Sequence, residues 1–141
     1  MKDQAIDILI VEDNLAHLQL TEYILRRNNF PGTIHVVRDG QEALDYLFRK
    51  LPFSDVAKFP IPDLILLDLN LPKRDGREVL KILKDDASLK DIPVVIVSTS
   101  DREEDVAFAL QHGAAAYISK SSGFEILREK LATVTQYARR P

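Results

Sequence analysis

The chain has 141 residues, of which 45% are hydrophobic and 29% are charged, and its formal net charge is −3. This length suits one globular domain, the lack of cysteine excludes disulfide and thiolate chemistry, and the acidic balance disfavours nucleic-acid binding. No apolar run approaches the roughly 20 residues of a membrane span, and acids interrupt the N-terminal stretch where a signal peptide would be apolar. We therefore expect a cytoplasmic protein that binds neither nucleic acid nor membrane.

Five short apolar runs are predicted to form β-strands. Runs rich in Val, Ile and Leu without polar alternation are typical of strands buried on both faces, as in a parallel sheet. The third run, DLILLDL, is apolar on both faces between its aspartates. The predicted strands are residues 6–12, 33–37, 63–69, 92–98 and 115–119.

Amphipathic segments alternate with these runs and are predicted to form helices. The stretch 51–62 contains three prolines and is predicted to be an ordered surface loop, with Phe53 and Phe59 packed back onto the sheet. Alternating strands and helices predict right-handed crossovers and a doubly wound α/β fold. The predicted helices are residues 15–29, 40–50, 76–86, 102–112 and 123–138. The side chains predicted to face inward are Leu20, Ile24, Leu25, Val79, Leu80, Ile82, Leu83, Val106, Ala109, Leu110, Phe124, Leu127, Leu131 and Val134.

Charged and hydroxyl side chains stand at the predicted carboxyl ends of four strands. Glu12 and Asp13 end the first strand, and Asp68 ends the third within an apolar run. Ser98 ends the fourth strand, and Lys120 directly follows the fifth. Each residue taken singly has an ordinary structural explanation, such as a helix cap or a surface lysine. Because open parallel sheets bind ligands at the carboxyl ends of their strands, the joint placement indicates a site.

The chemical composition of this set points to phosphoryl transfer. Clustered carboxylates without His or Cys are the hard oxygen ligands that Mg²⁺ prefers. A carboxylate can also act as a nucleophile and form an aspartyl phosphate, and Asp68 is the candidate because a buried carboxylate is costly without a partner. Lys120 and Ser98 can meet the remaining phosphoryl oxygens, which carry negative charge during transfer.

Four segments resemble, in order, the motifs of the receiver domains of bacterial and archaeal response regulators. The resemblance covers residues 6–138 and implies a five-stranded parallel sheet in the order 2-1-3-4-5, the flavodoxin-like receiver fold. It also implies a single receiver domain over residues 1–141, with a core of about 6–138 and no output domain. The matching segments are ILIVEDN, LILLDLNLPKRDG, IPVVIVSTS and GAAAYISK.

The resemblance implies a phosphoacceptor and a metal-ligand set. Asp68 matches the aspartate that is phosphorylated. Asp13, Asp68 and the main-chain carbonyl of Asn70 match the direct Mg²⁺ ligands. Glu12 matches the acid that reaches the metal through water.

The resemblance also implies residues that read the phosphoryl group. Ser98 and Lys120 match the hydroxyl and the ammonium that bind it, and Tyr117 matches the aromatic switch residue. Asn70 and Ser100, two residues beyond Asp68 and Ser98, are predicted to set the lifetime of the phosphoryl group.

Two features distinguish the chain within this family. Ser121 follows Lys120, where family members commonly have proline. The loop 51–62 and the segment LDLNLPKRDGREVL resemble single-domain regulators associated with phytochrome-type histidine kinases.

Partners follow from the same resemblance. It implies a partner histidine kinase, possibly of phytochrome type, as the source of the phosphoryl group. The signal would leave by association with a downstream protein, with the kinase as a phosphoryl relay, or with a second copy in a homodimer. The surface implied for the homodimer comprises residues 102–112, 115–118 and 123–138.

Two other functions compete with a signalling receiver. A Mg²⁺-dependent phosphohydrolase would typically carry a second aspartate as general acid two residues after the nucleophile, where this chain has Asn70. A phosphorylation-independent pseudo-receiver adaptor would keep the fold without its chemistry, and the complete acidic set with Lys120 argues against it. We therefore predict a phosphoacceptor protein that is not an enzyme beyond catalysing its own phosphorylation and dephosphorylation. The histidines, which lack partners at metal-ligand spacing, are predicted not to be ligands.

Overall fold

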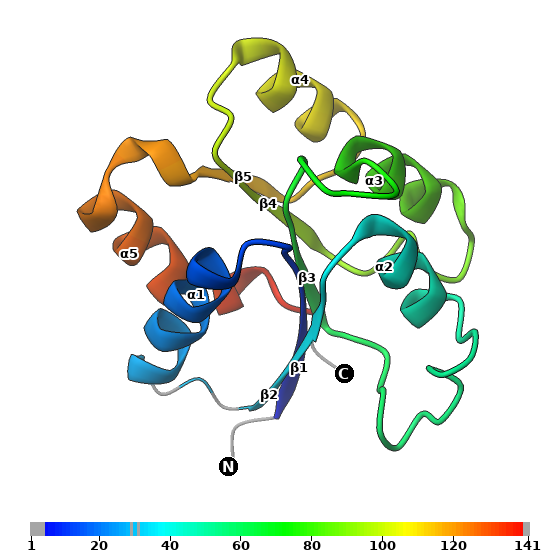
Figure 1. The fold of residues 1–141 in the computed structure, drawn as a ribbon. Coiled ribbons are helices and arrows are strands. Elements are labelled where there is room, and N and C mark those ends of the chain that lie inside the picture. The colour runs from blue at the N-terminus through cyan, green and yellow to red at the C-terminus, as the bar shows by residue number, and fades with distance from the viewer. Residues whose placement is uncertain (1–4, 29, 31, 140–141) are drawn as a thin grey trace.

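The computed structural model describes residues 5–28, 30 and 32–139, so the last residue of the predicted helix 15–29 lies outside the described residues. The strands are β1 (Ile6–Val11), β2 (Gly32–Val37), β3 (Leu64–Leu67), β4 (Val94–Ser98) and β5 (Ala116–Ser119). They form one parallel sheet in the order β2-β1-β3-β4-β5 (Figure 1). The predicted doubly wound fold and strand order are confirmed.

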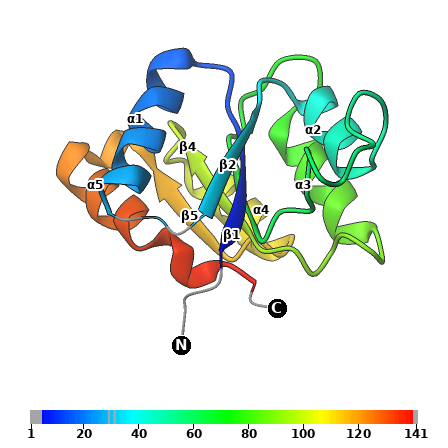
Figure 2. The ribbon, with the colours of Figure 1, turned by 90° about the horizontal axis from the view of Figure 1, so that it is seen from below.

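Helices cover both faces of this sheet. The α-helices are α1 (Leu15–Arg27), α2 (Gly40–Leu47), α3 (Gly76–Asp85), α4 (Glu103–Gln111) and α5 (Phe124–Ala132), and the 3₁₀ turns are η1 (Lys120–Ser122) and η2 (Val134–Tyr137). Figure 2 shows α1 and α5 on one side of the sheet and α2, α3 and α4 on the other. No helix among the described residues is both long enough and apolar enough to cross a membrane.

The sheet divides the hydrophobic core into two layers, and β3 serves both. Leu64 and Leu66 pack in the layer under α1 and α5, whereas Ile65 and Leu67 pack in the layer under α2, α3 and α4. All four side chains are at most 2% exposed. This explains why the sequence of β3 shows no polar alternation. Truncating any of them to alanine is expected to cost about 2–5 kcal/mol.

A side chain caps the first turn of each of the first three helices. Asn14 caps α1, and its Oδ1 accepts the backbone N–H of His17 at 3.0 Å. Asp39 and Asp75 cap α2 and α3 in the same way. Each such cap contributes about 1 kcal/mol of stability.

Two helix faces differ from the sequence-based prediction. Leu110 and Phe124 were predicted to face inward but are 50% and 52% exposed. In α4 the inward line is Asp105 and Ala109, which are one turn apart, so Leu110 points away from the sheet. In α5 the inward line begins at Leu127, one turn after the helix start, which leaves Phe124 at the outer end. The predicted helix 123–138 also divides into α5 and η2.

An aromatic cluster anchors the loop between α2 and β3. The Phe53 ring centroid lies 5.3 Å from that of Tyr46 and 5.0 Å from that of Phe59. The Tyr46 hydroxyl donates to the carbonyl of Pro60 at 2.9 Å, and burial raises the pKa of Tyr46 to about 12. Phe53 is buried and Phe59 packs against the same core, as predicted for this loop.

Candidate phosphoacceptor and metal site

Three carboxylates meet at the carboxyl edge of the sheet. Glu12 and Asp13 follow the last residue of β1, and Asp68 follows the last residue of β3. Because β1 and β3 are paired neighbours, their ends bring ligand oxygens of all three acids within 4.8 Å of one another. Glu12 and Asp68 are buried and Asp13 is exposed. Two of the three carboxylates are therefore buried, and the cluster is open to solvent at Asp13.

Lys120 reaches into this cluster from the end of β5, an edge strand of the sheet. It is the first residue of η1, directly after β5, and its side chain is only 6% exposed. Its ammonium pairs with Glu12, lies 3.4 Å from Asp68 Oδ2 and donates to Nδ1 of His17 at 3.1 Å. Burial raises the pKa of Glu12 above its ordinary value, and the charge of Asp68 adds to this effect. Lys120 lowers the pKa but does not outweigh burial.

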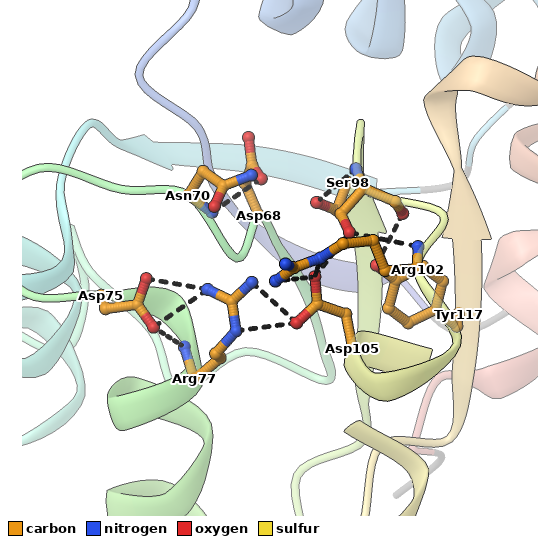
Figure 3. A network of polar contacts seen from close by, with 9 residues as sticks. Asp68, Asn70, Asp75, Arg77, Ser98, Arg102, Asp105 and Tyr117 are labelled. Atoms are coloured by element: carbon orange, nitrogen blue, oxygen red, sulfur yellow. Dashed lines mark hydrogen bonds and ion pairs between the residues drawn. The ribbon is translucent and has the colours of Figure 1, made fainter. Parts of the chain in front are cut away.

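Backbone N–H groups hold two of the acidic side chains, and one arginine holds the backbone that carries two of the acids. Glu12 accepts the N–H of Asn14 at 3.1 Å. Asp68 accepts the N–H of Asn70 at 3.1 Å, a contact that Figure 3 shows. Arg38, which follows β2, donates to the carbonyls of Glu12 and Asp13 at 3.1 and 2.7 Å. Arg38 was missed by the sequence analysis, although β2 lies next to β1 in the predicted strand order.

Gly76 brings the start of α3 against the backbone of Asp68. A Cβ atom at this position would lie 2.1 Å from the Asp68 carbonyl oxygen, so glycine is required there. The Gly76 N–H donates to the carbonyl of Leu69 at 2.8 Å. The helix and the strand end are therefore joined backbone to backbone.

Ser98 and Tyr117 are tied to the loop between β4 and α4. Ser98 is fully buried, and its Oγ accepts the N–H of Ser100 at 3.3 Å. The Tyr117 hydroxyl donates to the carbonyl of Ser100 at 2.7 Å. The Ser100 hydroxyl itself donates to Asp105 Oδ2 at 2.5 Å. The structure thus joins three predicted site residues through Ser100, whose own side chain is engaged by Asp105, a residue the sequence analysis missed.

The connection after Lys120 adopts a defined turn, although Ser121 stands where members of the family that the sequence resembles commonly have proline. Ser119 caps η1, since its hydroxyl accepts the N–H of Ser121 at 3.2 Å. Gly123 then takes a φ of +102°, in the region that favours glycine, before α5 begins. Local hydrogen bonds therefore hold Lys120 in place.

The donor set of the cluster suits a hard divalent cation. Three carboxylates converge and two of them are buried, and among the described residues the Lys120 ammonium pairs with two of them. Oxygen donors without nitrogen or sulfur favour ions such as Mg²⁺ and Mn²⁺. A bound cation would also relieve repulsion between like charges at this separation.

The family of response regulator receiver domains matches residues 8–132. The chain belongs to this family. The receiver domain is also 38% identical over 130 residues to the probable methanogenesis regulatory protein FilR2 of Methanothrix harundinacea, covering 92% of this chain and 81% of FilR2. It is 39% identical over 120 residues to response regulator Rcp1 of Synechocystis sp., covering 85% of this chain and 80% of Rcp1.

Solved structures agree with this assignment. The crystal structure of the phosphorylated cyanobacterial phytochrome response regulator RcpA superimposes on this receiver domain with a TM-score of 0.86 at 39% identity, covering 96% of this chain and 94% of RcpA. The crystal structure of the Mn²⁺-bound form of Rcp1 gives a TM-score of 0.84 at 36% identity, covering 94% of this chain and 93% of the Rcp1 chain. The receiver fold therefore extends over nearly the whole chain.

His17 is expected to titrate below its ordinary pKa of 6.5 in the metal-free receiver domain. Burial disfavours the imidazolium, and repulsion from the Lys120 ammonium lowers the pKa further. Together these two effects outweigh the nearby carboxylates, which raise the pKa. The neutral ring accepts from Lys120 through Nδ1 and so carries its proton on Nε2. An NMR titration of the ring should show the lowered pKa in wild type and a higher value in Lys120→Met. A Lys58→Met control should match wild type. An unchanged pKa in Lys120→Met would contradict the assignment.

Proposed function

We propose that this receiver domain accepts one phosphoryl group on Asp68 from a histidine kinase, in a Mg²⁺-dependent reaction, and signals by a changed protein–protein association. The main support for this proposal is the cluster of Glu12, Asp13 and Asp68, whose ligand oxygens lie within 4.8 Å of one another. The Lys120 ammonium lies 3.4 Å from Asp68 Oδ2. The phosphorylated RcpA and the Mn²⁺-bound Rcp1 structures also support the proposal.

Each residue of the cluster has a chemical role in this proposal. An Asp68 carboxylate oxygen attacks the phosphorus of a phosphohistidine, so that an O–P bond forms while the P–N bond breaks. The leaving imidazole keeps the electron pair of the broken bond and takes a proton from solvent. Lys120, already beside Asp68, would bind a phosphoryl oxygen and stabilise its negative charge.

We assign the metal to the same residues. Asp13, Asp68 and the carbonyl of Asn70 would hold Mg²⁺ directly, and Glu12 would hold it through water. When bound, Mg²⁺ would supply positive charge that offsets the negative charge of the carboxylates and of the phosphoryl group. Asn70 is exposed and its amide cannot donate a proton as a general acid would, which favours a receiver over a phosphohydrolase.

We also propose which residues respond to the phosphoryl group and which surface then binds a partner. Ser98 and Tyr117 would respond to the phosphoryl group, while Asn70 and Ser100 would set its lifetime. Exposed apolar side chains on α4 and after α5, Leu110 and Tyr137, support a phosphorylation-dependent homodimer through α4, β5 and α5. The names of the relatives Rcp1 and RcpA support a phytochrome-type kinase as the partner.

Intact-mass measurement tests the phosphoacceptor. Wild type incubated with acetyl phosphate and Mg²⁺ should gain the mass of one phosphoryl group, because acetyl phosphate offers the same electrophilic phosphorus without a kinase. Asp68→Asn should gain none, since the amide is a poor nucleophile. Asp91→Asn, which changes an exposed aspartate before β4, should be labelled like wild type. Equal labelling of Asp68→Asn and wild type would overturn the assignment.

A further inference from the structure

His17 is a titratable side chain beside the carboxylate cluster, and the proposed phosphoryl chemistry gives it no role. It lies in the first turn of α1, where the N-cap Asn14 accepts its backbone N–H at 3.0 Å. Its Nδ1 lies 3.1 Å from the Lys120 ammonium. Because an ammonium only donates hydrogen bonds, the ring nitrogen is the acceptor. Burial and the charge of Lys120 lower the pKa of His17, so the ring is neutral near neutral pH and able to accept.

The contact with His17 completes the hydrogen bonds of Lys120. An ammonium carries three N–H donors, and this one has three acceptors among the described residues. They are Oε1 of Glu12, Oδ2 of Asp68 and Nδ1 of His17. The acceptors come from the ends of β1 and β3 and from α1, so three separate elements fix the position of the Lys120 Nζ atom. Two of the acceptors are carboxylates, and the third is a neutral ring.

The three acceptors differ in how a divalent cation would affect them. Glu12 and Asp68 belong to the cluster that we assign to Mg²⁺, whereas His17 lies outside it. A cation in the cluster attracts both carboxylates and repels the ammonium of Lys120. A neutral imidazole outside the donor set keeps its attraction for the ammonium. The contact with His17 therefore gains importance as the other two contacts weaken.

A cavity beside the two side chains gives Lys120 room to move if this contact is lost. The cavity is about 100 Å³ and is lined by His17, Leu20, Thr21, Lys120 and Leu127. This is more space than a single water molecule needs, so a lysine freed from His17 can adopt other rotamers. A large change of rotamer would take the ammonium away from Asp68.

We infer that His17 is a positioning residue that holds the Lys120 ammonium beside Asp68 when a divalent cation occupies the carboxylate cluster. The inference rests on the proposed function, because it takes Asp68 as the phosphoacceptor and Lys120 as the group that stabilises the phosphoryl oxygens. The role assigned to His17 is exerted through Lys120 alone.

The inference predicts which property of the His17 side chain matters. Phenylalanine keeps a ring of similar size and loses the acceptor nitrogen. Asparagine loses the ring and keeps an acceptor, because its Oδ1 is joined to the backbone through the same number of bonds as Nδ1 of histidine. His17→Phe should therefore impair the action of Lys120, and His17→Asn should preserve it. A residue that acts by apolar packing would show the opposite order.

The rate at which acetyl phosphate phosphorylates Asp68 in saturating Mg²⁺ is the first measurement. Removing a group that orients a site residue typically costs about 10–100-fold, and we expect His17→Phe to react about tenfold more slowly than wild type. His17→Asn should react at close to the wild-type rate. Gln19→Leu, which changes an exposed residue of α1, is the matched control and should react like wild type.

The accessibility of Lys120 gives a second readout that does not depend on phosphorylation. Its side chain is only 6% exposed, so acetic anhydride should modify it slowly in wild type. With Mg²⁺ present, peptide mass spectrometry should show severalfold faster modification of Lys120 in His17→Phe and the slow wild-type rate in His17→Asn. The exposed Lys58 is the internal reference and should be modified equally fast in all three proteins.

The outcomes separate the two proposals. If acetyl phosphate does not label wild type, or labels Asp68→Asn equally well, the proposed function fails. If wild type is labelled on Asp68 but His17→Phe reacts as fast, or His17→Asn is slowed as much as His17→Phe, the positioning role of His17 is overturned while the proposed function stands. Equal modification of Lys120 in His17→Phe and wild type would overturn that role as well. His17→Leu, which also lacks an acceptor, takes the place of His17→Phe if that variant does not fold.

Discussion

Replacing Lys120 with methionine is expected to destabilise the metal-free protein by about 3–5 kcal/mol near neutral pH, the usual cost of breaking a buried ion pair by removing one partner. The side chains of Lys120, Glu12 and Asp68 are 6%, 5% and 8% exposed. Without the ammonium, two buried carboxylates face each other and Asp13, while the nearby Arg38 guanidinium is engaged by backbone carbonyls. Urea denaturation in the presence of a chelator measures the loss.

The pH dependence gives this prediction a second, independent check. The pKa of Glu12 is raised in the folded protein, so the folded state binds this proton more tightly than the unfolded chain does. The resulting stabilisation is fully present below the ordinary value of 4.5 and is lost as pH rises through the raised value. Removing Lys120 raises the pKa further. The stability difference from wild type should therefore be smaller at about pH 5 than at about pH 8.

A matched lysine variant provides the control. Lys58→Met changes an exposed lysine in the loop 51–62 and should alter stability by no more than about 0.5 kcal/mol at either pH. If Lys120→Met costs no more than this control, or costs more at low pH than at high pH, the charge balance described for the cluster is wrong.

Asp13→Asn is expected to raise the melting temperature of the metal-free protein and to remove most of its response to Mg²⁺. Asp13 lies within 4.8 Å of two other carboxylates, and like charges at such distances disfavour the folded state. Mg²⁺ that binds only the folded protein stabilises wild type by about 1.4 kcal/mol at roughly ten times Kd. For a domain of this size that corresponds to a shift of about 3–6 °C.

Thermal melting of wild type and Asp13→Asn, each with and without Mg²⁺, measures both effects. Wild type should melt higher with the ion, and the variant should start above metal-free wild type and change little. Asp91→Asn removes an exposed aspartate elsewhere and should keep the full Mg²⁺ shift. A variant of Asp13 that melts lower without metal yet keeps the full shift would show that Asp13 is a structural residue and not a ligand.

The elements that carry the acids could be predicted because local sequence determines them. The run LILL between two aspartates has no polar face, which predicted a strand buried on both sides that ends at Asp68, and the structure has this strand. The strand order came from the resemblance and is confirmed. Helix faces were predicted less well, since Leu110 is as apolar as a core residue and only the placement of α4 over the sheet exposes it.

The partners of the acidic residues could not be predicted because they come from distant parts of the chain. His17 meets Lys120 across 103 positions, and Arg77 meets Asp105 across 28. The sequence analysis found no histidine at metal-ligand spacing, and His17 in fact contacts the ammonium of Lys120. Asp105 resembles an ordinary acid in the first turn of a helix, and only its burial distinguishes it.

The close approach at Gly76 makes the surroundings of Asp68 mechanically anisotropic. On the α3 side, backbone lies directly against backbone, so no rotamer change can make room. On the α4 side, the loop is held through the side chains of Ser100, Asp105 and Arg77, which can move by rotation about single bonds. Any strain that arises at Asp68 is thus relieved in one direction, toward α4 and β5. The same chain can therefore keep one half of its carboxyl edge constant while the other half changes shape.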